Sequence, residues 1–286
     1  MTKVDYPKQL TVMVTSRCNL RCKLCFQSEY RSDLNPSILD KMRHVYFHLD
    51  WFHPIGGEPL LYDLKKLYDL PFSDRCKFKI ITNGTLITPE QAVNIVRNVD
   101  RLIVSVDGGT EDAYREMRGF SLEKVLRGIE RVQSCKTETG NLTPHIEINF
   151  LLTKSTVDTL PTLAAWAASN GVDCINTFYP VYNNPAIKSS EEICKEEAKV
   201  SILKAKRHMK IIEPERRGGD ECRRPWNTCF VDVNGNVSLC CFGSPSLGNL
   251  NEKSFDDCWF GPLATKIRET VNTEKEIRQC KKCPVR

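Results

Sequence analysis

The alternation of apolar and polar positions predicts a β-strand that begins near residue 10 and ends near residues 15–16. Leu10, Val12 and Val14 share one face of this strand, which is the period-two pattern of a strand with one buried face. Further apolar runs of strand length follow at residues 49–55, 78–82, 102–106, 146–152 and 174–178. The pattern therefore predicts six strands along the first two thirds of the chain.

Helical patterns separate these strands. Each opens with Ser, Thr or Pro and continues with apolar residues at helical spacing, which is typical of a helix start. Such patterns begin near residues 36, 88, 121 and 156. Strands that alternate with helices predict a parallel sheet with right-handed crossovers, and six repeats suit an open barrel better than a closed eightfold one. The expected fold is α/β, a partial (β/α)6 TIM-like barrel with its functional groups at the carboxyl ends of the strands.

The pattern changes after about residue 190. One long charged helix is expected over residues 191–209, followed by a linker at Gly218 and Gly219. Asn234 and Gly235 lie between two short apolar runs, which predicts a tight hairpin with a type I′ turn. We therefore expect two domains, a partial barrel over residues 1–210 and a small hairpin-plus-helix module over residues 211–286.

Length and composition exclude several classes of protein. The 286 residues, 41% of them hydrophobic, can bury a large core, so a disulfide-stapled miniprotein is excluded. No uncharged run is suited to span a bilayer, and the N-terminus lacks the apolar core of a secretory signal. A cytoplasmic protein with reduced thiols is expected. The net charge of +5 makes nucleic acid an unlikely partner. The basic stretch at residues 204–224 is either a solvated face or a docking site for an acidic electron donor or an anionic substrate.

Cysteine is unusually frequent, with 14 residues in the chain. Cys18, Cys22 and Cys25 form a CxxxCxxC motif in the loop after the first strand. Three thiolates in one loop can converge on one site, and they leave one position open. A structural zinc site takes four protein ligands, whereas a cubane iron-sulfur cluster with three cysteines keeps one iron available to a cofactor or substrate. Zinc or unliganded thiols remain the alternative for this motif.

A second motif, Gly56-Gly57-Glu58-Pro59, falls where the second strand ends. The two glycines allow close backbone approach to a ligand, the carboxylate of Glu58 can receive an ammonium group, and Pro59 stiffens the turn. Alone, the motif is explained equally well as an ordinary strand-to-helix turn. Next to a three-cysteine loop one strand earlier, it indicates a specific binding site.

Together these motifs resemble those of the radical S-adenosylmethionine (SAM) enzymes. The resemblance covers essentially the whole chain and includes two further strand ends, Thr82-Asn83-Gly84 and Ser105-Val106-Asp107-Gly108, and the later pair Arg118-Gly119. It implies that the three cysteines of the CxxxCxxC loop hold a 4Fe-4S cluster. The open iron of that cluster would be chelated by the amine and carboxylate groups of SAM.

The resemblance also implies roles for residues around SAM. The Gly-Gly-Glu-Pro turn would bind the SAM amine, Ser105 and Asp107 would contact the ribose or the methionine portion, and Arg118 would neutralise the carboxylate. Asn149, on the fifth strand, is a candidate for a ribose contact.

Three more positions belong to the implied SAM site. Asn83 lies at the end of the third strand. Leu24 occupies the position between the second and third cysteines where the family generally carries an aromatic residue beside adenine, and Phe26 lies just beyond the third cysteine.

The C-terminal cysteines match a second pattern. Cys222 precedes a Gly-x-x-x-x-Cys motif that ends at Cys240, and Cys280 and Cys283 follow near the C-terminus. The arrangement resembles the twitch module, a truncated relative of the SPASM domain, in which four cysteines hold a further 4Fe-4S cluster. Cys241 is the alternative to Cys240 as a ligand, and a zinc ribbon is the alternative to a cluster.

The resemblance implies a reductive radical mechanism. A low-potential donor such as flavodoxin or ferredoxin would supply an electron to the N-terminal cluster, SAM would be cleaved, and the 5′-deoxyadenosyl radical would abstract hydrogen from the substrate. The expected reaction is a net two-electron oxidation, either dehydrogenation or crosslinking, of a small molecule or short peptide. The auxiliary cluster would accept the second electron or help to hold the substrate.

Two other functions stay open. One is redox-neutral epimerisation of a sugar, an aminoglycoside or a peptide residue, in which Cys241 or Cys229 donates a hydrogen atom. The other is a zinc-stabilised binding protein, which does not explain a three-cysteine site followed by Gly-Gly-Glu-Pro. Among the histidines, His53 is the best placed to face a substrate.

Overall fold

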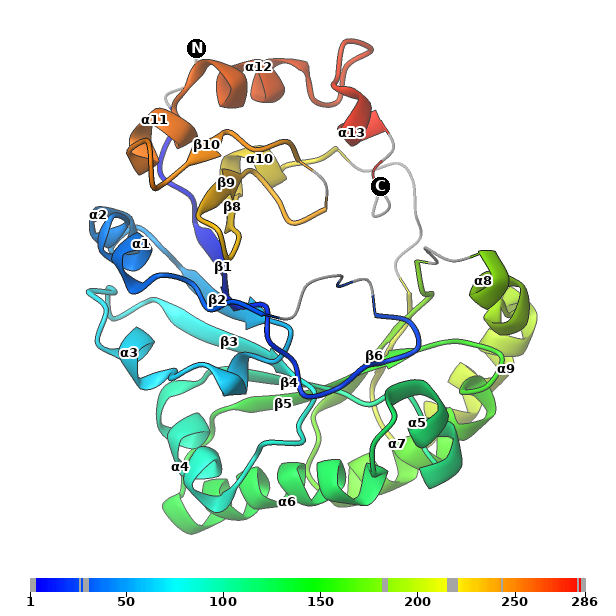
Figure 1. Cartoon of the computed structure of the whole chain (residues 1–286). Coiled ribbons are helices and arrows are strands. Elements are labelled where there is room, and N and C mark those ends of the chain that lie inside the picture. Colours follow the sequence, from blue (N-terminus) through cyan, green and yellow to red (C-terminus); the bar gives the residue numbers. More distant parts are fainter. Residues whose placement is uncertain are drawn as a thin grey trace. The chain divides into compact units, whose positions relative to one another are not determined.

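The computed structural model describes residues 4–25, 27, 31–181, 185–214, 221–242, 244–281 and 283 (Figure 1). Phe26 and residues 215–220, which include Gly218, Gly219 and part of the basic stretch, lie outside the described residues. The chain forms two compact units that take up alternating segments of the sequence. Unit 1 comprises residues 1–17, 29–78 and 216–286, and unit 2 comprises residues 18–28 and 79–215. The expected division at residue 210 stays a prediction.

Unit 1 joins strands from the beginning of the chain to a hairpin from its end. Its strands are β1 (Gln9–Thr15), β2 (Trp51–Gly56), the first residues of β3 (Lys77–Thr82), β8 (Thr228–Val231), β9 (Asn236–Ser238) and β10 (Gly248–Asn249). β1 pairs in parallel with β2 on one side and with β8 on the other, and β2 pairs with β3. β8, β9 and β10 are antiparallel. The hairpin thus extends the sheet beside β1, a pairing between distant segments that local sequence patterns cannot reveal.

Short helices complete unit 1. They are α1 (Pro36–Asp40), α2 (Arg43–Tyr46), η1 (Pro59–Leu61, a 3-10 turn), α3 (Lys65–Tyr68), α10 (Arg224–Asn227), α11 (Phe255–Trp259), α12 (Pro262–Thr270) and α13 (Arg278–Lys281). The core of the C-terminal part contains Phe255 and Trp259, both fully buried, together with the buried thiols of Cys229 and Cys258. These two cysteines therefore pack as small apolar side chains.

Unit 2 is a run of parallel strands covered by helices on one face (Figure 1). Its strands are the end of β3, β4 (Arg101–Ser105), β5 (His145–Leu151), β6 (Cys174–Phe178) and β7 (Ile211–Ile212). Its helices are α4 (Pro89–Asn98), α5 (Glu111–Arg118), α6 (Leu122–Thr139), η2 (Val157–Thr159, a 3-10 turn), α7 (Leu160–Ser169), α8 (Pro185–Glu191) and α9 (Lys195–Ala205).

The two faces of β5 show how the sequence directs this packing. Ile146, Ile148 and Phe150 are fully buried. Because side chains alternate along a strand, Glu147 and Asn149 point to the opposite face, which is polar. The six predicted strands are confirmed by β1–β6, which pair in parallel in sequence order. Among the described residues, no helix combines the length and apolar character needed to cross a membrane.

Three local predictions need correction. A helical segment does follow Thr156 as expected, but its first turn is 3-10 and α7 begins at Leu160. The Thr156 hydroxyl donates to Leu151 O (2.7 Å) and accepts from Thr153 N (3.1 Å) instead of capping a helix. The single helix over residues 191–209 is interrupted: α8 ends at Glu191, and α9 starts after Cys194, whose extended backbone and Sγ form its N-cap.

The third error is the type I′ turn of the hairpin. Such a turn needs positive φ at both central residues, but among the described residues only Asn272 has positive φ outside glycine. Instead, Asp232 Oδ1 accepts hydrogen bonds from Asn234 N and Asn236 N, both at 2.9 Å, and Gly235 alone is left-handed at φ 86°. The acidic side chain thus organises a longer turn than the Asn-Gly pair suggests.

Candidate functional site

The three-cysteine loop is part of unit 2, and backbone contacts fix its shape. Cys25 N donates to Cys22 O at 3.2 Å, which closes a turn between the second and third cysteines, and Lys23 N donates to Met117 O at 2.9 Å. Cys18 and Cys22 are half-buried, and Cys25 is exposed. Leu24, predicted beside adenine, is half-buried in the same turn. The loop is therefore docked on the end of α5.

Nitrogen donors face two of the sulfur atoms. Leu20 N lies 3.4 Å and Asn83 Nδ2 4.0 Å from Cys18 Sγ, and Arg118 Nη1 lies 3.7 Å from Cys22 Sγ. Burial raises the pKa of the Cys22 thiol, and the positive charge of Arg118 partly offsets this rise. N–H donors around thiolates are typical of iron-sulfur sites, where they tune the cluster. The donor set of this loop therefore fits a cluster.

Arg118 and Asp107 form a largely enclosed ion pair beside the loop. Arg118 Nε donates to Asp107 Oδ2 at 2.7 Å, and Leu151 N donates to Asp107 Oδ1 at 2.9 Å. Burial disfavours the Arg118 guanidinium, but the charge of Asp107 outweighs this and raises the Arg118 pKa. Both Asp107 oxygens are thus engaged by the protein. The geometry makes Asp107 the residue that orients Arg118, and direct contacts of either residue with SAM stay predictions.

A row of polar side chains crosses unit 2 at one register position. Ser105 at the end of β4 pairs with Asn149 in β5, which pairs with Asn176 in β6. Asn176 Nδ2 donates to Asn149 Oδ1 at 3.3 Å and to Glu147 Oε2 at 2.7 Å. The sequence prediction included Ser105 and Asn149 but missed Asn176. The signal was available, because an Asn stands in the middle of the sixth predicted strand.

The Gly-Gly-Glu-Pro turn belongs to unit 1 and is held by the end of β1. Gly57 N donates to Thr15 O at 3.1 Å, and Glu58 N donates to Arg17 O at 2.8 Å. A Cβ on Gly56 would lie 2.3 Å from Thr15 O. Glycine is therefore needed here because the protein's own backbone passes close to this position. Glu58 is fully buried, and its Oε1 accepts from Leu60 N at 3.0 Å, capping η1. The carboxylate thus has a local structural role, and its contact with a SAM amine stays a prediction.

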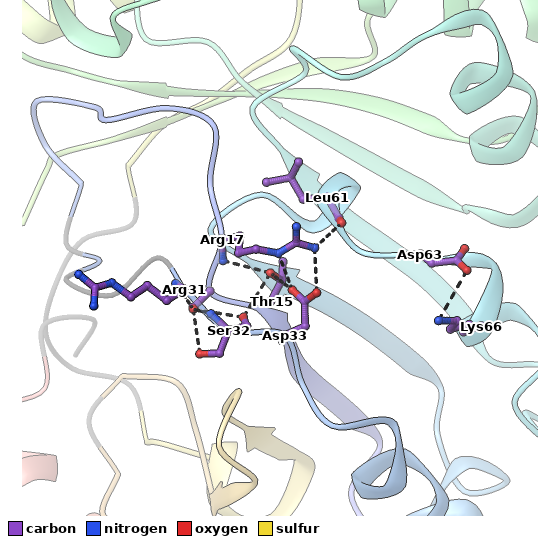
Figure 2. A network of polar contacts seen from close by, with 9 residues as sticks. Thr15, Arg17, Arg31, Ser32, Asp33, Leu61, Asp63 and Lys66 are labelled. Carbon is purple, nitrogen blue, oxygen red and sulfur yellow. Dashed lines mark hydrogen bonds and ion pairs between the residues drawn. The ribbon is translucent and has the colours of Figure 1, made fainter.

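Figure 2 shows the polar network that supports this turn. Arg17 donates from Nε and Nη2 to the two oxygens of Asp33, both at 2.8 Å, and from Nη2 to Leu61 O at 2.9 Å. Thr15 Oγ1 donates to Asp33 Oδ1 at 2.6 Å. Burial opposes ionisation of Asp33, but the hydrogen bonds from Arg17 and Thr15 outweigh it and lower the pKa of this carboxyl. The network ties η1 to the segment that enters the cysteine loop.

His53 lies in the middle of β2, in register with Thr11 of β1, and is 7% exposed. It precedes the Gly-Gly-Glu-Pro turn by three residues rather than standing at the strand end. Its role toward a substrate stays a prediction.

The four predicted auxiliary-cluster cysteines lie in unit 1, where all four are half-buried. Burial, and after it the electrostatic influence of Cys240, Glu276, Cys222 and Cys283, raises the pKa of Cys280 to about 11. Three cysteines that act electrostatically on a fourth must lie near it. The structure therefore gathers Cys222, Cys240, Cys280 and Cys283 in one region.

Hydrogen bonds fix this region. Cys222 N donates to Asn272 Oδ1 at 2.8 Å, and Asn272 Nδ2 donates to Cys222 O at 3.2 Å, so Asn272 brackets the first cysteine. Cys283 N donates to Cys280 O at 3.2 Å. The sequence prediction missed Asn272, although an Asn just past a helix end favours the left-handed backbone that it adopts here (φ 67°).

The described residues contain no group of three or more His, Cys, Asp or Glu side chains in position to hold a single metal ion. Zinc would need each sulfur about 2.3 Å from one ion. A cubane cluster binds each thiolate through a different iron and so spaces the sulfurs more widely.

Comparisons with known proteins agree with these features. Residues 12–150 match the radical SAM superfamily, and residues 222–284 match the iron-sulfur cluster-binding domain SPASM. A probable GTP 3′,8-cyclase from Methanococcus aeolicus is 28% identical over 215 residues, which cover 69% of this chain and 70% of that protein. The chain spans about half the length of some other curated relatives that it matches.

Two solved structures share the fold. Streptococcus suis SuiB bound to S-adenosylmethionine matches with a TM-score of 0.70 and 17% identity over 98% of this chain and 71% of that one. AnSMEcpe with bound AdoMet and the Cp18Cys peptide matches with a TM-score of 0.70 and 19% identity over 97% of this chain and 86% of that one. They confirm the expected fold class, α/β with a partial TIM-like barrel and C-terminal strands and helices.

Proposed function

Because this chain is a radical SAM protein with a C-terminal SPASM domain, we propose that it reductively cleaves S-adenosylmethionine and uses the resulting 5′-deoxyadenosyl radical to abstract hydrogen from a substrate. The observation that carries this proposal is the three-cysteine loop, whose sulfurs Cys18 and Cys22 face N–H donors from Leu20, Asn83 and Arg118. Family membership implies 4Fe-4S clusters and SAM as cofactors.

Different residues of the chain would then bind different parts of the cofactors. Cys18, Cys22 and Cys25 would hold the cluster through three of its irons. The Arg118 guanidinium, oriented by Asp107, would attract the SAM carboxylate by a charge-assisted hydrogen bond. The backbone of the Gly-Gly-Glu-Pro turn would bind the SAM amine. β1 and Asp33 would hold this turn in place.

The proposed reaction is a net two-electron oxidation of a peptide or small molecule, by dehydrogenation or crosslinking. Two observations support it: the SPASM domain supplies cysteines for a second cluster that can accept an electron, and the similar structure of anSMEcpe contains a bound peptide. We place the protein in the cytoplasm, with a low-potential donor such as flavodoxin or ferredoxin as its electron source.

Epimerisation is the second candidate, because a thiol next to the auxiliary cysteines could quench the substrate radical. A donor thiol must be reachable by the substrate. Cys229 is 1% exposed inside the module core, and burial raises its pKa, whereas Cys241 is exposed. Burial therefore favours Cys241 over Cys229 as the donor in this alternative.

The test uses anaerobically purified protein with reductant and SAM. Iron, sulfide and 5′-deoxyadenosine are measured first, and zinc in place of iron would refute the proposal. Peptides and small molecules that the neighbouring genes suggest as substrates are then added to the reaction in deuterated water. A product with two hydrogen atoms fewer than the substrate supports oxidation. A product that differs from the substrate only in one hydrogen replaced by deuterium from the solvent supports epimerisation.

A further inference from the structure

A buried carboxylate stands beside the three-cysteine loop. Glu191, the last residue of α8, has a side chain that is 3% exposed. Its Oε1 lies 2.6 Å from the ammonium group of Lys23, the residue that follows Cys22. Its Oε2 accepts a hydrogen bond from Ser155 Oγ at 2.7 Å. Burial opposes ionisation, but the hydrogen bonds from Lys23 and Ser155 outweigh it and keep the Glu191 pKa below its usual range.

Lys23 connects this carboxylate to the end of α5. Its Nζ also lies 2.7 Å from Glu116 Oε1, and its backbone N donates to Met117 O at 2.9 Å. Glu116 and Met117 immediately precede Arg118, whose guanidinium lies 3.7 Å from Cys22 Sγ. One side chain from inside the cysteine motif therefore bridges α5 and α8.

The burial of the pair distinguishes it from ordinary surface ion pairs. Exposed pairs contribute little because water and salt screen them, whereas a buried carboxylate that loses its cation is left uncompensated. Lys199 and Glu196 on α9 form an exposed pair at 2.8 Å, with side chains 61% and 78% exposed. Arg118 and Asp107 form a second enclosed pair beside this loop, with side chains 16% and 4% exposed. In the Lys23 pair, by contrast, the cation belongs to the cysteine motif itself.

We propose that the Lys23–Glu191 ion pair is a tether that positions the three-cysteine loop, and with it Cys22, against Arg118. Lys23 is thus a positioning residue for the cluster. The inference rests on the proposed function, because it takes this loop as the cluster site.

The experiment measures how fast iron is lost from the reduced, anaerobic protein to a ferrous chelator. In Lys23→Met the fraction of iron held by the N-terminal loop should be lost about tenfold faster, as expected when a charge-assisted hydrogen bond no longer holds the loop closed. Lys23→Arg keeps the charge and should stay within about twofold of wild type. Lys199→Met is the matched control and should leave the rate unchanged.

Two further variants distinguish the possible results of this experiment. In the Cys18→Ala, Cys22→Ala, Cys25→Ala background, Lys23→Met should have no effect on the remaining iron. Wild-type iron loss in Lys23→Met, or equal acceleration by Lys199→Met, would overturn the tether. If Lys23→Met does not fold by circular dichroism, Glu191→Gln decides, since it keeps the side-chain size and removes only the charge: unchanged iron loss overturns the proposal.

A full iron content in the triple-alanine variant itself would instead refute the loop as the cluster site. The two failures are therefore distinguishable.

Discussion

The chain contains two groups of cysteines that differ in what surrounds them. Around the N-terminal loop, Cys22 faces the Arg118 guanidinium, and Lys23 reaches the buried Glu191. In the C-terminal group, the pKa of Cys280 is raised by burial and then by the nearby Cys240, Glu276, Cys222 and Cys283. In the first group a cation contacts a cysteine sulfur, whereas in the second the described hydrogen bonds join Asn272 to the backbone of Cys222 and Cys283 N to Cys280 O.

This difference accompanies a difference in the number of cysteines, three in the first group and four in the second. A cluster held by three cysteines would leave one iron open to a further ligand, and the largely enclosed Arg118 guanidinium would favour one that carries a carboxylate. A site with four cysteines is complete and needs only that the chain hold its thiols together. The comparison predicts that changes near the first group affect SAM chemistry, while changes near the second affect cluster retention and product formation.

The largest effect is expected from replacing Cys18, Cys22 and Cys25 together with Ala. If these cysteines hold the catalytic cluster as proposed, their loss should remove roughly half of the iron and abolish 5′-deoxyadenosine formation. Iron analysis and chromatography of the nucleoside products measure both. Cys76→Ala, a half-buried cysteine outside either group, is the control and should retain both. Unchanged SAM cleavage in the triple variant would exclude the loop as the site of this chemistry.

Removing the second group should separate SAM cleavage from product formation. Cys280→Ala with Cys283→Ala should also remove roughly half of the iron, yet some 5′-deoxyadenosine should still form because the first group is intact. Product should disappear, since its formation needs the auxiliary cluster. Product that persists after iron loss would limit this cluster to a structural role, and full iron content would refute the ligand assignment.

Much of this division was predictable from the sequence, because it depends on residues close together along the chain. The strands were visible from their apolar runs, and both cysteine groups from their spacing. The partners were not: Lys23 and Glu191 are separated by 168 residues, and β1 and β8 by most of the chain. Helix prediction failed at residues 192–194 because charged composition suits a helix there, whereas the bonds of Glu191 and the cap at Cys194 end one helix and start another.

An intermediate effect is expected on SAM affinity. Arg118→Ala should weaken SAM binding about ten- to a hundredfold without loss of iron, because a charge-assisted hydrogen bond contributes roughly 1.5 to 3 kcal/mol. Equilibrium binding to the anaerobic protein measures this affinity. Arg115→Ala, which removes an exposed arginine of the same helix paired with Glu111, is the matched control and should bind normally.

Glu58 needs two variants, since the structure already gives its carboxylate a capping bond to Leu60 N. Glu58→Gln keeps an oxygen for that bond and removes the charge, whereas Glu58→Ala removes both. If Glu58 receives the SAM amine, both variants should lose affinity by about ten- to a hundredfold. If Glu58→Gln binds SAM normally and Glu58→Ala binds it weakly, Glu58 acts only as the cap of η1.

The smallest effect is expected at Asn272, which brackets Cys222 in the second group. Asn272→Gly keeps the left-handed backbone and loses both side-chain hydrogen bonds, which costs about 1 kcal/mol because the residue is exposed and water replaces part of the loss. Asn272→Ala loses the same bonds and adds about 1 kcal/mol of backbone strain at φ 67°. Anaerobic thermal unfolding should therefore rank wild type above Gly and Gly above Ala, with SAM affinity unchanged in both. An Ala variant as stable as wild type would show that Cys222 is held in place without this bracket, whereas an equal loss in both variants would assign the whole effect to the hydrogen bonds.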